Sequence, residues 1–173
     1  MTTPYVDHCL NDLSIKKATL EAERRQRVNE SFQLKGRNSA PAAGDSALRM
    51  HVLGAKGELA VAQYLNIEDE VFKDLMPSRG SIDLPPNIDV KTRSKHWMDL
   101  VVQLDDDPHK IFVHATSEDR NVRLHGWTYG SRVMKNCFQK DPANGRPAYF
   151  VASSVLHPMA LLRSFLVDLG YSK

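Results

Sequence analysis

The sequence predicts one globular domain that mixes helices and strands, of α/β (α+β) class, preceded by a helical extension. Its 173 residues suit a single domain rather than two, and a chain of this size can bury a core without disulfides. Patterns typical of helices stand at both ends of the chain and enclose a run of short strand-like patterns. We therefore expect a helical extension and linker at residues 1–45 and a folded domain at residues 46–173.

Composition excludes several classes of protein. No run approaches about 18 consecutive apolar residues, so no transmembrane helix is expected. The first residues lack the basic start and apolar core of a secretory signal, so we expect a cytoplasmic location. Cys9 and Cys137 are too few and too far apart for a disulfide framework and are expected as free thiols, although an incidental pair stays open. The formal net charge of +2 is too small to identify a nucleic-acid binder by itself.

The first predicted helix spans roughly residues 12–32, which are rich in Glu, Lys, Arg and Gln. Because apolar positions are sparse, it is interpreted as a solvated helix lying on the domain or on a partner subunit, which makes it the candidate surface for a homodimer. The alternative is a basic arm that contacts a phosphate backbone. That arm would use Lys16, Lys17, Arg24, Arg25 and Arg27. Residues 36–44 have the composition of a linker.

A second helix is predicted from Asp45 or Ser46 to about Asn66. Its core-facing stripe consists of Leu53, Gly57, Ala60, Val61, Tyr64 and Leu65. The glycines inside this helix are expected to allow close packing of the helix on a sheet. Glu58 flanks the stripe, so its carboxylate either reaches water at the boundary or points into a cleft.

Short strands follow this helix. Residues 88–93 alternate between apolar and polar side chains, as in a half-buried strand. Further strands are predicted at residues 99–104, 111–116, 121–129 and 148–152, with a short helix at 131–138 and a closing helix from Pro158 to about Gly170. Trp97 and Trp127 are interpreted as core aromatics, with stacking on a splayed base as the alternative. The seven histidines show no spacing typical of metal ligands, so each is expected to be structural or on the surface.

The most informative segment is residues 81–95, SIDLPPNIDVKTRSK. Side chains alternate along a strand, so Asp89 and Lys91 lie on one side, about 6.6 Å apart. The LPPNI segment can turn the chain and bring Asp83 alongside Asp89 from a neighbouring strand. Two carboxylates beside one lysine suit a hard cation such as Mg²⁺, and the lysine can position or deprotonate an attacking water. Taken alone, an Asp-x-Lys triplet on a strand is more typical of a surface ion pair.

The residues around this triplet strengthen its interpretation as part of a catalytic site. They are the helix segment Gly54–Ala55–Lys56–Gly57–Glu58–Leu59–Ala60–Val61–Ala62, then Asp83, then Ile88–Asp89–Val90–Lys91–Thr92–Arg93. In order and spacing this series resembles the PD-(D/E)XK, or restriction-endonuclease-like, nuclease superfamily, in particular its small phage- and bacterium-borne members. Two positions depart from the pattern: Ile82 replaces the proline before Asp83, and Asp89 replaces a glutamate.

The resemblance implies a fold, a cofactor and a role for each residue. The fold would be a central mixed β-sheet flanked by helices. Asp83 and Asp89 would be ligands of Mg²⁺, for which Mn²⁺ substitutes, and the Val90 carbonyl would add a third oxygen. Glu58 would bind a second metal or orient metal-bound water, and Lys91 would act on the water and the transition state. The implied activity is hydrolysis of DNA phosphodiester bonds in the cytoplasm of a bacterium or a phage-infected cell.

A rim of basic side chains is expected to contact DNA phosphates around this site. Its members are Arg79, Arg93, Lys95, Arg120, Arg123, Arg132 and Lys135. Three alternatives stay open. The first is a dimeric resolvase of branched DNA, and the second is a nuclease-fold binding or inhibitor module that does not cut. The third is an α+β interaction domain in which the motif match is accidental.

Overall fold

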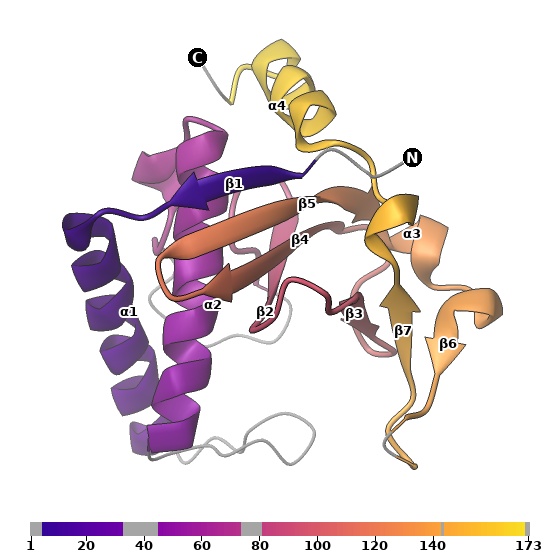
Figure 1. The fold of residues 1–173 in the computed structure, drawn as a ribbon, viewed down its shortest axis with the longest axis horizontal. Coiled ribbons are helices and arrows are strands. Elements are labelled where there is room, and N and C mark those ends of the chain that lie inside the picture. The colour runs from indigo at the N-terminus through magenta and orange to yellow at the C-terminus, as the bar shows by residue number, and fades with distance from the viewer. Residues whose placement is uncertain (1–4, 33–44, 74–80, 143, 172–173) are drawn as a thin grey trace.

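The computed structural model describes residues 5–32, 45–73, 81–142 and 144–171, which form a mixed α/β fold (Figure 1). Its main sheet has four strands in the order β1-β5-β4-β2. These strands are β1 (Val6–Cys9), β2 (Ile88–Arg93), β4 (Ile111–Glu118) and β5 (Asn121–Tyr129). Strand β2 runs parallel to β4, whereas β5 runs antiparallel to both β4 and β1. The sheet is therefore mixed, and β2 is one of its two edge strands.

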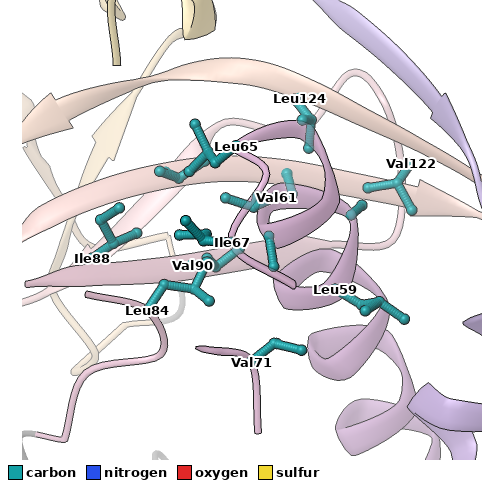
Figure 2. Packing of buried hydrophobic residues seen from close by; sticks show 14 of the residues in the cluster. Leu59, Val61, Leu65, Ile67, Val71, Leu84, Ile88, Val90, Val122 and Leu124 are labelled. Atoms are coloured by element: carbon teal, nitrogen blue, oxygen red, sulfur yellow. The ribbon is translucent and has the colours of Figure 1, made fainter. Parts of the chain in front are cut away.

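Helix α2 covers one face of this sheet, and a second long helix, α1, packs against α2 (Figure 1). Helix α1 (Asp12–Ser31) begins where the Asn11 side chain accepts a hydrogen bond from the Ser14 amide at 2.8 Å, and it lies along α2 (Asp45–Tyr64). Figure 2 shows how Leu59 and Val61 of α2, and Leu65 directly after it, pack against buried side chains of β2 and β5. Helix α4 (Met159–Asp168) closes the chain and contacts β5.

A second, smaller sheet covers the opposite face of β4. It contains β3 (Leu100–Gln103), β7 (Ala148–Val151) and β6 (Gln139–Lys140), all antiparallel and in the order β3-β7-β6. Phe112 of β4 lies in the cluster of buried side chains between the two sheets. Short helical turns connect these strands: α3 (Gly130–Val133) and 3-10 turns at Asn136–Phe138 and Ser153–Val155, with a further one at Glu68–Glu70 after α2.

Most elements expected from the sequence are confirmed. Both long helices, the strands at 88–93 and 121–129, and the closing helix lie where their patterns indicate. Cys9 and Cys137 are free thiols, as expected. Trp127 is a core residue, but the same expectation for Trp97 is wrong, because 79% of Trp97 is exposed.

The sequence did not predict strand β1. It pairs with β5, and the main hydrophobic cluster also takes in Leu10 and Ala18. The described part of the N-terminal segment therefore packs into the core of the fold. Within the described residues, no helix combines the length and the apolarity that crossing a membrane requires.

Helix α2 lies very close to β2 at Gly57. A Cβ atom at this position would overlap Thr92 Oγ1 and lie 3.0 Å from Thr92 Cβ. The helix can therefore sit this close to the strand only because residue 57 has no side chain, which confirms the packing role expected for this glycine. Gly54, one turn earlier, is different, since a Cβ there would come no nearer than 3.9 Å to another side chain.

We expect Gly57→Ala to destabilise the protein by about 2 kcal/mol or more, because the added methyl group pushes α2 away from β2. Gly54→Ala is the matched control and should be neutral or stabilising by up to about 1 kcal/mol, since alanine favours the helix and has room. Urea denaturation of both variants measures the difference. Adding Thr92→Ala should recover part of the loss in Gly57→Ala, and equal stability of the two glycine variants would contradict the close approach.

Candidate active site

Asp83 lies against the free edge of β2. The chain turns through a cis Pro85–Pro86 bond and returns antiparallel, so that Leu84 pairs with Ile88 and the Asp83 amide donates to the Ile88 carbonyl at 2.9 Å. The Asp83 carboxylate Oδ2 accepts a hydrogen bond from the Val90 amide at 2.6 Å. The turn expected from LPPNI is thus present. It holds Asp83 beside the strand that carries Asp89 and Lys91.

Asp89 and Lys91 lie on the same face of β2, as their alternation indicates. Lys91 Nζ is 3.1 Å from Asp89 Oδ1 and 3.1 Å from Asp106 Oδ2. Asp89 Oδ2 is also 3.3 Å from Lys110 Nζ, which donates a 2.6 Å hydrogen bond to the Ser81 carbonyl. Two lysines and two carboxylates therefore form one ion-pair network on this face.

The network sets the charge of Lys91. Burial acts to lower the pKa of this lysine, but the charges of Asp89 and Asp106 and their hydrogen bonds outweigh it and raise the pKa above its usual value. An ammonium group with a raised pKa stays protonated near neutral pH. Lys91 is accordingly suited to offer positive charge and hydrogen bonds rather than to accept a proton.

Glu58 lies on α2 and turns toward α1. Its two carboxylate oxygens accept from the Arg25 guanidinium at 2.7 and 2.6 Å. Arg25 also donates through Nε to Glu21 at 2.7 Å, and Arg24 binds the same Glu21 carboxylate. Glu58 is 5% exposed, so this pair is largely shielded from water. Because Arg24 and Arg25 pair with carboxylates, they do not extend as a free basic arm.

A cavity of about 240 Å³ lies between α1, α2 and the segment that leads into β2. Glu58 and Asp83 both line it, together with Arg25, His51 and Phe72. Asp89 and Lys91 are not among its lining residues. The predicted site residues therefore divide into two groups, Glu58 and Asp83 at the cavity and Asp89 and Lys91 outside its lining, and Asp83 is hydrogen-bonded to the strand that carries the second group.

The carboxylates of the two groups still influence one another. The pKa of Asp83 is raised well above its usual value, first by burial and then by the negative charges of Glu58 and Asp89. Repulsion of this kind is typical of carboxylates that a cation would stabilise.

The donors that the sequence assigned to Mg²⁺ fit this ion in their chemistry, since all are carboxylate or carbonyl oxygens. Their arrangement is not that of a complete metal centre. In the described parts of the chain, no three or more His, Cys, Asp or Glu side chains gather in a way that would hold a metal ion.

The basic residues assigned to a DNA-binding rim are spread over the molecule. Arg93 ends β2 and Lys95 follows it as an exposed residue, so both lie near the candidate site. Arg123 binds Asp7 at 2.7 Å on β5, two positions from β2 in the sheet order, and Arg120 pairs with Asp12. The remaining members are exposed Arg132, which contacts His157, and exposed Lys135, while Arg79 lies outside the described residues.

A histidine cluster lies on β4 and β5. His114 stacks on His125 with ring centroids 4.5 Å apart, and Thr116 Oγ1 lies 2.8 Å from His125 Nε2 and 2.7 Å from His96 Nδ1. Burial, followed by neighbouring positive charge, lowers the pKa of His114 to about 3 and that of His125 to about 4. Both rings are neutral near pH 7 and pack inside the protein, as expected for structural histidines.

Comparison with known proteins gives no match to this chain among family models, curated proteins or solved structures.

We expect Arg25→Met to lower the free energy of unfolding by about 2–4 kcal/mol, because it leaves Glu58 and Glu21 without their shared cation. Arg25→Lys should recover only part of the loss, since an ammonium group cannot reproduce the bidentate contact. Arg27→Met, at an exposed position of the same helix, is the control and should change stability by less than about 0.5 kcal/mol. Urea denaturation that gave equal midpoints for Arg25→Met and Arg27→Met would contradict a stabilising role for this pair.

Proposed function

We propose that the protein is a metal-dependent nuclease that hydrolyses DNA phosphodiester bonds, with a restriction-endonuclease-like core of the PD-(D/E)XK type. The observation that carries the proposal is the contact between the Asp83 carboxylate and the Val90 amide. Val90 stands between Asp89 and Lys91, so this contact fixes an aspartate beside an Asp-x-Lys strand. That is the arrangement which the nuclease resemblance requires of these three side chains.

Asp83, Asp89 and the Val90 carbonyl are the groups proposed to hold Mg²⁺. When bound, Mg²⁺ supplies charge neutralisation at the phosphate and a lowered pKa for a coordinated water. The pKa of Asp83 is raised by burial and then by like-charge repulsion from Glu58 and Asp89, and a cation in this position would offset both effects. The same repulsion argues against an ordinary surface ion pair, in which each carboxylate would face only its cation.

Lys91 is proposed to contact the phosphate oxygens and to hold the attacking water. Its ammonium is fixed from two sides by Asp89 and Asp106, and its raised pKa keeps it charged. A fixed positive charge stabilises the negative charge that develops on phosphorus oxygens in the transition state. The network of β2 therefore supports the electrostatic role of this lysine over its use as a general base.

Glu58 is proposed to act from the cavity side, with Arg25 as its positioning residue. The bidentate contact orients the carboxylate within the cavity that Asp83 also lines. Arg93 and Lys95 are proposed to contact the DNA backbone close to β2, because both belong to the strand and loop that carry the site. Such an enzyme would work on DNA in the cytoplasm of a bacterium or an infected host.

One observation favours a second candidate, a nuclease-fold module that binds DNA or protein without cutting. Among the described residues, each carboxylate of the site except Asp83 is paired with a protein cation: Glu58 with Arg25, and Asp89 with Lys91 and Lys110. A site neutralised in this way has less need of a metal. Whether the protein cleaves DNA distinguishes the two candidate functions.

The test is cleavage of linear duplex, supercoiled plasmid, single strand, four-way junction and RNA with Mg²⁺, Mn²⁺ or EDTA. We expect metal-dependent cutting of DNA that falls by about 100-fold or more in Lys91→Ala and in Asp89→Asn, since each removes a group that acts on the transition state. Lys140→Ala, at an exposed position of β6, is the matched lysine control and should cut as the wild type does.

Each outcome of this panel decides between the candidates. Symmetric cutting of the junction by a dimer would identify a resolvase. Binding without cutting would support the second candidate. Equal rates in the wild type and in Lys91→Ala would contradict the proposed catalytic role of β2.

A further inference from the structure

Trp97 is an exposed aromatic side chain in the loop between β2 and β3. It is 79% exposed, which exceeds the value for every other large hydrophobic side chain in the described part of the chain, including Leu13 at 74%. An indole is normally buried or placed at an interface, because its large apolar surface is costly to leave in water. By contrast, Trp127 is 6% exposed and donates its indole N–H to the Pro158 carbonyl at 3.1 Å.

The loop that carries Trp97 is anchored on both sides of the indole. The His96 ring contacts Thr116 Oγ1 at 2.7 Å, and its backbone amide donates to Glu118 Oε1 at 3.2 Å. The Met98 amide donates to the Lys95 carbonyl at 3.1 Å. His96 and Met98 are both partly buried, whereas the residue between them points outward. The backbone therefore presents the indole to solvent from a fixed position.

Two basic residues, Arg93 and Lys95, precede Trp97 closely in the chain, and the acidic Asp99, whose charge acts on Arg93, follows it. Arg93 ends β2 on the face that Asp89 and Lys91 share, and Lys95 is exposed two residues before Trp97. Among the described residues, Lys95 has no ion-pair partner. The nearby Glu118 carboxylate is engaged by the His96 amide. An exposed aromatic ring flanked by cations is the combination that holds single-stranded nucleic acid, in which bases stack on rings and phosphates meet basic groups.

We propose that Trp97 stacks on an unpaired nucleobase, while Arg93 and Lys95 contact the phosphates of the same strand. The proposal rests on the proposed nuclease function and names its substrate class: nucleic acid with single-stranded or splayed bases close to the cut. A base inside an intact duplex offers no free face for an indole, so duplex should bind more weakly than single strand at this loop. The loop follows β2 directly, which places base recognition next to Asp89 and Lys91.

The experiment measures binding in EDTA, so that no cutting occurs. The probes are a fluorescently labelled oligothymidylate, an oligomer of equal length made of abasic units, and a hairpin duplex. The abasic oligomer keeps the phosphates and removes the bases. Fluorescence anisotropy gives the affinities of the wild type, Trp97→Ala, Trp97→Phe and Lys140→Ala, and tryptophan emission of the wild type reports stacking directly.

We expect oligothymidylate to quench tryptophan emission and to bind more tightly than either other probe. Trp97→Ala should weaken its binding by about 5- to 100-fold, the range seen when a stacking residue is removed. Trp97→Phe should retain most of the affinity because it keeps an aromatic face, and Lys140→Ala should bind as the wild type does. Binding of the abasic oligomer should be nearly the same in all four proteins, since it depends on charge.

Several results would overturn the proposal. The abasic oligomer could bind as tightly as oligothymidylate, or Trp97→Ala could bind both equally well. Alternatively, Trp97→Ala could convert a dimer to a monomer in sedimentation with DNA affinity unchanged, which would make the loop a contact between copies of this chain. Because the measurement needs no metal, its outcome is independent of catalysis. A protein that does not cut DNA can still stack a base on Trp97, and a protein that cuts DNA can lack this stacking.

Discussion

The close approach of α2 to β2 governs the geometry of the candidate site. Gly57 lets the helix backbone reach Thr92, and this contact places the next helix residue, Glu58, at the wall of the cavity that Asp83 lines from the strand side. The edge of β2 supplies the second constraint, because its Val90 amide takes up the Asp83 carboxylate. Gly57 of α2 and the Val90 amide of β2 thus determine where Glu58 and Asp83 lie.

Protein cations neutralise most carboxylates of the site. Arg25 neutralises Glu58 and joins α1 to α2, so the N-terminal helix contributes to the site as well as to the core. Lys91 pairs with Asp89 and Asp106, which outweigh its burial and keep it charged, and Lys110 also pairs with Asp89. Asp83 lacks a comparable cation among its described contacts and accepts a backbone amide instead, and burial, followed by the charges of Glu58 and Asp89, raises its pKa. It is accordingly the group of the site with most to gain from an added cation.

Local sequence patterns predicted most helices and strands. They did not predict the elements and side-chain contacts that depend on residues far apart in the chain. Alternation identified β2, and the LPPNI turn indicated that Asp83 returns beside it, because both depend on neighbours in the chain. Strand β1 is only four residues long and exists through its pairing with β5, more than 100 residues away, which no local pattern encodes. Arg25 meets Glu58 across two helices, and helical spacing identifies only the Glu21 contact four residues earlier. Residue type alone indicated burial for Trp97, but its neighbours His96 and Met98 take the inward positions.

We propose that Asp83 and Asp89 form a site for a hard divalent cation at the edge of β2, and calorimetric titration with Mn²⁺ tests this site. We expect Mn²⁺ to bind the wild type, with an affinity that weakens by at least about 10-fold in Asp83→Asn and in Asp89→Asn, because each variant loses a charged oxygen ligand. Asp69→Asn, at an exposed position after α2, should bind Mn²⁺ as the wild type does. A wild type that takes up no Mn²⁺, or site variants that bind it as tightly as the Asp69→Asn control, would contradict this proposal.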